Sequence, residues 1–106
     1  MPHYLFTASY TTEGIKGVLK EGGSARLKAV GELVKGAGGT IETAYWAFGD
    51  PDFLIIAELP DNTAAAALAT HVAATGSASV QTTVLLTAAE LDAAAKTSVT
   101  YRPPGG

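Results

Sequence analysis

The chain has 106 residues, of which 47% are hydrophobic and 16% charged, and it contains no cysteine. This composition predicts one globular domain, because a chain of this size can bury roughly two thirds of its unfolded surface. The formal charge of −3 excludes a chain-wide basic field for nucleic acid, and the missing thiols exclude disulfides, iron–sulfur clusters and thiolate zinc sites.

Targeting and cofactor signals are missing as well. There is no basic leader and no run of about 20 apolar residues, so we expect a cytoplasmic protein with no membrane partner. The two histidines and the carboxylates are the remaining strong metal ligands, but no metal-ligand spacing, nucleophile triad or phosphate loop appears. We therefore expect neither a structural metal nor a cofactor.

The first third of the chain predicts a strand followed by an interrupted helix. Residues 3–10 are rich in aromatic and hydroxyl side chains and alternate in polarity, with Tyr4 on one face and His3 on the other. Apolar residues then recur at helical spacing up to Gly22, and a second amphipathic stretch continues to Gly38. These patterns predict one helical crossover that is broken near Gly22.

A hairpin follows the crossover. Strand-like runs at 40–48 and 53–59 flank a short acidic turn, so they are expected to pair as antiparallel neighbours. The turn contains Gly49, Asp50 and Asp52, which we interpret as plain hairpin chemistry in which Asp52 accepts backbone amide protons. The alternative is that the two carboxylates bind a cation or act as an acid and a base.

The last third predicts a helix, a strand and a short terminal helix. A helix with many small residues is expected at 63–75 and a strand at 79–86. A capping-box sequence that begins at Thr87 opens the short helix. These elements complete a single domain at residues 1–96, and the proline- and glycine-rich residues 97–106 are interpreted as a tail.

The element order predicts an α+β fold of the ferredoxin-like β-α-β-β-α-β type, with a four-stranded antiparallel sheet, helices on one face, and a short C-terminal helix added. Apolar side chains occupy both faces of the strands, since Leu54 and Ile56 alternate with Phe53 and Ile55. An uncovered face would expose several hundred Å² of apolar surface in a monomer. We therefore predict a homodimer or higher homo-oligomer in which a second copy covers that face.

Several segments carry a family resemblance, and they are Tyr10–Ile15, Gly22–Arg26, Gly38–Gly39 and Phe48–Asp52. Together they resemble the GYD domain family of small bacterial and archaeal proteins. The resemblance implies a ferredoxin-like domain of the dimeric α/β-barrel group. The Gly-Tyr-Asp element of that family is similar to the turn here, with Gly49 and Asp52 in place and Pro51 where a tyrosine is expected. Related barrel groups include heme-handling proteins, cofactor-free monooxygenases and isomerases.

Two polar residues are weak candidates for catalysis. Glu58 is a charged residue in an apolar strand, where a desolvated carboxylate can act as a general base or bind a ligand. Its position beside Leu59 and Pro60 favours the alternative, a solvent-exposed strand end. His3 can accept a proton in the space between two sheets, or it can be a rim or interface residue. The expected ligand-binding residues are Tyr45, Trp46, Phe48 and Glu58.

The leading hypothesis is a small oligomeric α/β-barrel protein that binds a small organic molecule in a pocket beside the sheet. One alternative is a cofactor-free enzyme of the oxygenase or isomerase type, and the sequence leaves open whether the protein is an enzyme. The other alternative is a structural or assembly module without a ligand.

Overall fold

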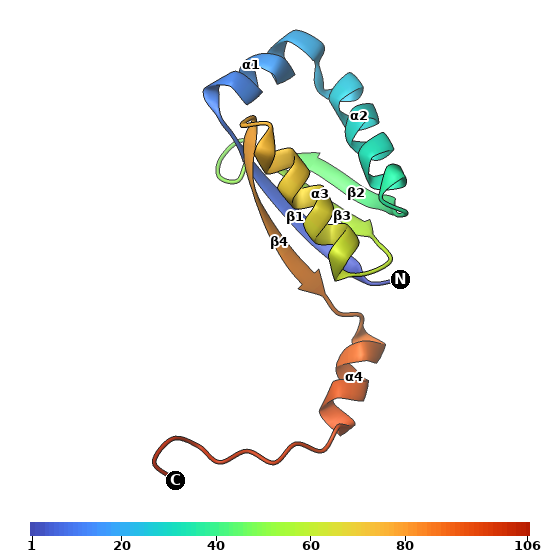
Figure 1. Cartoon of the computed structure of the whole chain (residues 1–106), viewed down its shortest axis with the longest axis vertical. Helices are drawn as coiled ribbons and strands as arrows, with labels where there is room; N and C mark the ends of the chain where they lie inside the picture. The colour runs from blue at the N-terminus through green and yellow to red at the C-terminus, as the bar shows by residue number, and fades with distance from the viewer.

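Four strands form one antiparallel sheet in the computed structural model, which describes residues 1–106 (Figure 1). In sequence order, the strands are β1 (His3–Tyr10), β2 (Thr40–Trp46), β3 (Phe53–Glu58) and β4 (Ala78–Leu85). Their order across the sheet is β2-β3-β1-β4. The helices are α1 (Thr12–Glu21), α2 (Gly23–Gly36), α3 (Asn62–Ala74) and α4 (Ala88–Lys96). The predicted ferredoxin-like α+β fold is confirmed, including the broken crossover and the added C-terminal helix.

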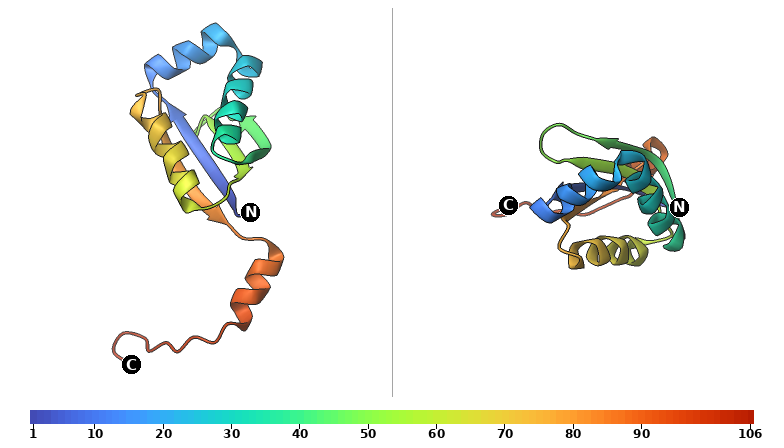
Figure 2. Two further views of the ribbon diagram at one scale, coloured as in Figure 1. Left: turned by 45° about the vertical axis from the view of Figure 1, so that its right-hand side comes forward. Right: turned by 90° about the horizontal axis from the view of Figure 1, so that it is seen from above.

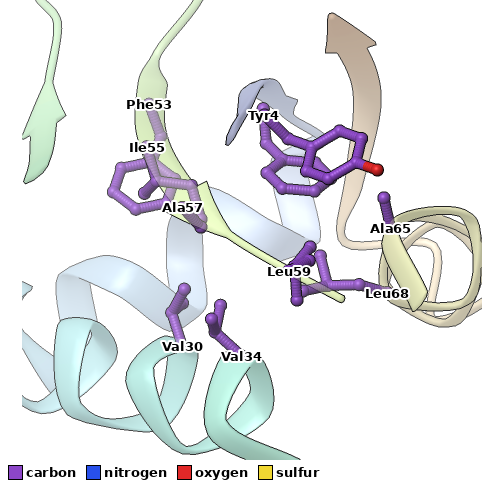
Figure 3. Close-up of a cluster of buried hydrophobic side chains, with 10 residues drawn as sticks. Tyr4, Val30, Val34, Phe53, Ile55, Ala57, Leu59, Ala65 and Leu68 are labelled. Carbon is purple, nitrogen blue, oxygen red and sulfur yellow. The ribbon is translucent and has the colours of Figure 1, made fainter. Parts of the chain in front are cut away.

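One face of the sheet carries the core. α2 packs along β2, and α3 packs along β4, while α1 contacts α2 and β1 (Figure 2). The core consists of alternate side chains of β1 and β3 together with apolar residues from α2, α3 and the end of β3. Its members are Tyr4, Phe6, Val30, Val34, Phe53, Ile55, Ala57, Leu59, Ala65 and Leu68 (Figure 3).

Local signals in the sequence set the helix ends. The Thr11 side chain accepts a hydrogen bond from the Gly14 amide at the start of α1, and the Asp61 carboxylate accepts one from the Ala64 amide at the start of α3. Gly22 separates α1 from α2 with a φ of +86°, a backbone conformation that other residues rarely adopt. The crossover is therefore two helices that meet at an angle (Figure 1).

The other face of the sheet carries no helix and is called here the open face. Leu5, Leu54 and Ile56 lie on it and are half-buried, and Tyr45 is exposed there. The register between β2 and β3 shifts by one residue at Glu42, which is a β-bulge. The expected distribution of apolar residues over both faces is thus present.

The C-terminal segment leads away from the sheet (Figure 1). α4 has no buried residue, and every residue from 86 to 106 is exposed. The radius of gyration is 16.8 Å, compared with about 13 Å for a compact domain of this length. The domain boundary at residue 96 stays a prediction. No helix has the length and apolar character needed to cross a bilayer.

Candidate functional site

A cleft of about 340 Å³ lies between the helices and the covered face of the sheet. Pockets that bind small organic molecules have volumes of roughly 300 Å³ and above and are mostly apolar, and this cleft meets both conditions. The floor comes from β1 and β3, and the walls come from α1, α2 and α3. The apolar lining consists of Phe6, Ala8, Val18, Val30, Leu33, Phe53, Ile55, Leu68, Val72 and Ala78.

The cleft exists because α1 does not fill the space above the sheet. α1 contributes Gly14 and Gly17 to the lining. At Gly17 an added Cβ atom would meet no other atom within 4 Å, so the wall has room for a larger side chain. The break at Gly22 turns α1 away from the line of α2, so the two helices meet at an angle (Figure 2). Both helices contribute residues to the cleft lining.

Charged side chains also border this apolar space. Glu13, Glu21 and Arg26 all belong to its lining. The Arg26 guanidinium lies 3.9 Å from a Glu21 carboxylate oxygen, too far for a direct hydrogen bond, and both side chains are about one third exposed. Arg26 has five donors and uses none of them in a close contact with Glu21, so its guanidinium can still bind an acceptor group of a ligand.

A second group of polar residues lies on the open face, where β1 begins and β3 ends. His3 and Glu58 are directly opposite each other in the β1–β3 register. One imidazole nitrogen of His3, Nδ1, contacts a carboxylate oxygen of Glu42, and the other, Nε2, lies 3.6 Å from a carboxylate oxygen of Glu58. We call these three residues the His3 cluster. An imidazole between two carboxylates can exchange a proton with them, or the three can bind a divalent cation.

The sequence does not single out Glu42, because its position depends on the β-bulge. In regular alternation counted back from Trp46, Glu42 would point toward the helices. The bulge turns it to the open face instead. Ile41 and Ala44 both pack against the core although they are three residues apart, whereas a regular strand spaces such residues by two. This irregular spacing is the sequence signal for the bulge.

The four expected ligand-binding residues are spread over both faces of the sheet and a loop. Tyr45 lies on the open face, and Glu58 lies there beside His3 rather than among aromatic rings. Trp46 is on the helix side, with its ring centroid 4.6 Å from that of Phe53, and its indole N–H is buried without a hydrogen-bond partner. Phe48 is fully exposed in the loop after β2. None of the four lines the cleft, and their role in binding stays a prediction.

The acidic turn has a structural role. The Asp52 carboxylate accepts a hydrogen bond from the Tyr10 amide at 2.8 Å, which confirms that it binds a backbone amide. Asp50 accepts a longer bond, at 3.1 Å, from the Ser9 hydroxyl, and it is exposed. Gly49 lies in the same exposed loop, and the turn as a whole is held against the end of β1.

Comparison with known proteins agrees with this architecture. A search of curated protein sequences finds no match. The family model of the GYD domain matches residues 4–95, which run from β1 through nearly all of α4 and make up most of the chain. The chain therefore belongs to the GYD domain family.

Proposed function

We propose that the protein binds a small, mainly apolar organic molecule that carries an anionic or hydrogen-bond-accepting group. The observation that carries this proposal is the apolar cleft of about 340 Å³ between the helices and the sheet. The cleft is partly open to solvent, and a concave, mostly apolar surface of this size is the usual form of a small-molecule site. Arg26 supplies the polar contact that orients a ligand whose remaining surface contacts apolar side chains.

We further propose that the protein functions as a homodimer in which a second copy covers the open face. The support is the half-buried apolar row of Leu5, Leu54 and Ile56, which no helix covers. Binding in the cleft does not require this assembly, since the cleft lies on the other side of the sheet.

The binding proposal is tested with 1-anilinonaphthalene-8-sulfonate, an aromatic anion whose emission rises in an apolar site. Trp46 packs on Phe53, and Phe53 lines the cleft, so a dye bound there should receive excitation energy from this single tryptophan. The test variant is Gly17→Leu, which places a large side chain in the cleft. We expect the dye affinity to fall by about tenfold or more.

The matched control is Gly31→Leu in α2. An added Cβ at Gly31 also meets nothing within 4 Å, but Gly31 does not line the cleft. Both substitutions replace a helical glycine and should raise helix propensity by about 1 kcal/mol, so neither is expected to unfold the protein. Equal dye binding by both variants, or no saturable binding by the unaltered protein, would contradict the proposed site.

The role of Arg26 is tested separately with a pair of dyes. Arg26→Gln should weaken binding of the sulfonated dye several-fold, because it removes the charge that faces the anion. It should leave binding of N-phenyl-1-naphthylamine, the same ring system without the sulfonate, unchanged. Lys28→Gln is the control, since Lys28 belongs to the same helix but not to the cleft lining.

A further inference from the structure

The His3 cluster brings three potential ligand side chains together from three neighbouring strands. His3 belongs to β1, Glu42 to β2 and Glu58 to β3, and their ligand atoms all lie within 4.8 Å of one another. We propose that these residues bind one divalent transition-metal ion, with Zn²⁺ as the representative probe. The site lies on the open face and does not depend on the proposed ligand cleft.

The distances allow coordination with side-chain rotation alone. Zinc bonds of 2.0–2.2 Å in tetrahedral geometry place ligand atoms about 3.4 Å apart. His3 Nε2 and Glu58 Oε1 are already 3.6 Å apart. The backbones are held by the sheet, because His3 and Glu58 are register partners and the bulge fixes Glu42 beside them. Ligands on strands are positioned more rigidly than ligands on loops.

The charge balance also favours a cation. The side chains of Glu42 and Glu58 are 38% and 36% exposed, and neither forms an ion pair with a lysine or arginine. Two carboxylates that share one imidazole leave net negative charge on a partly desolvated surface. A bound cation removes the repulsion between the two carboxylates.

The ligand types point to the kind of ion. Imidazole favours zinc and its transition-metal neighbours over calcium and magnesium, which prefer all-oxygen sites. Three protein ligands leave at least one coordination position for water or another molecule, as in metal sites that are not purely structural. The site is therefore expected to hold an ion with an exchangeable ligand.

The experiment uses the full chain without an affinity tag, stripped of metal, and titrates Zn²⁺ by calorimetry. We expect one ion per chain. His3→Ala, Glu42→Gln and Glu58→Gln should each reduce the Zn²⁺ affinity by about tenfold or more. Loss of a residue that only hydrogen-bonds a metal ligand already lowers metal affinity by about tenfold. Co²⁺ gives a second measurement, because its visible absorption bands should intensify in the unaltered protein and not in His3→Ala.

Two controls separate this site from general binding by exposed groups. His71→Ala removes the other histidine, which is exposed on α3, and Glu32→Gln removes an exposed carboxylate of α2. Both should bind Zn²⁺ like the unaltered protein. Absence of binding, full binding by any one of the three cluster variants, or equal loss in His71→Ala would overturn the proposal. The cluster variants should also bind the naphthalene dye normally, so this outcome is distinct from failure of the cleft.

Discussion

Asp50 and Asp52 are two residues apart in one turn, but only Asp52 is positioned to stabilise the fold. Asp52 is half-buried and accepts a 2.8 Å hydrogen bond from the Tyr10 amide. We expect Asp52→Ala to lower the free energy of unfolding by about 1–3 kcal/mol, because a half-buried amide loses its charged acceptor. Asp50→Ala should change it by less than about 0.5 kcal/mol, as is usual for an exposed residue. Urea unfolding of both variants measures the difference, and equal losses would contradict it.

Two glycines of α1 should respond to alanine in opposite directions. At Gly14 an added Cβ would lie 1.9 Å from the backbone oxygen of Ser77, so the helix or the start of β4 must move. Gly14→Ala is expected to destabilise the protein by about 1–3 kcal/mol. Gly17→Ala meets no atom within 4 Å and should stabilise it by about 0.5–1 kcal/mol through helix propensity. Thermal and urea unfolding should show this change of sign, and a similar response at both positions would be inconsistent with the close approach at Gly14.

Sequence reasoning succeeds for residues whose surroundings are local. Turn chemistry indicates that Asp52 accepts an amide proton, but not that the donor is Tyr10, which is 42 positions away in sequence. Sequence reasoning does identify the role of Thr87, which follows from a capping motif within four residues. It fails for Glu42, whose direction is set by a bulge, and for Glu58, whose neighbour His3 is 55 positions away in sequence. A single sequence carries no record of pairings at that separation.

α4 begins at a capping box formed by Thr87 and Glu90, and the Glu90 carboxylate is titratable. The pKa of Glu90 lies below its ordinary value of 4.5, because the Thr87 backbone amide and then its hydroxyl interact with the carboxylate. A carboxylate with a lowered folded-state pKa stabilises the helix above its ordinary pKa and loses that effect as the pH falls. We therefore expect α4 to fray below about pH 4.5 while the sheet stays folded.

Amide resonances measure the titration of α4. The Thr87 amide, which donates to a Glu90 carboxylate oxygen at 2.9 Å, should shift upfield as the bond is lost. In Glu90→Gln the side chain still accepts this bond but does not titrate, so the Thr87 resonance should be independent of pH over that range. A shift of equal size in the variant would contradict the role of the capping box.

The order of elements follows from the sequence, but the cleft does not. Glycine pairs and capping residues indicate where each helix begins and ends, and the strands alternate as expected. The volume above the sheet depends on the angle that Gly22 sets between α1 and α2, which no periodicity encodes. The sequence pattern does not identify Phe6, Phe53 and Leu68 as neighbours around one cleft, while a role of Tyr45, Trp46 and Phe48 in binding stays a prediction.

The molecule as a whole exposes more surface than a compact monomer of its mass. Its accessible surface is 7132 Å², whereas a folded monomer of 10.8 kDa exposes about 5,500 Å². The excess, about 1,600 Å², is roughly twice the area of about 800 Å² that each partner buries in a standard protein–protein interface. The open face and the C-terminal segment are where this surface lies, and the exposed apolar residues Leu86, Leu91, Val99 and Tyr101 belong to that segment.

We therefore expect the protein to sediment as a homodimer at micromolar concentration, with a melting temperature that rises with protein concentration. Ile56→Lys should give a monomer, because it places a charge at the centre of the open face, where a second copy would desolvate it. Leu19→Lys is the matched control: it also replaces an exposed apolar residue by lysine, but on α1. It should stay dimeric. A monomeric unaltered protein, or equal dissociation of both variants, would mean that the open face is not where two copies meet.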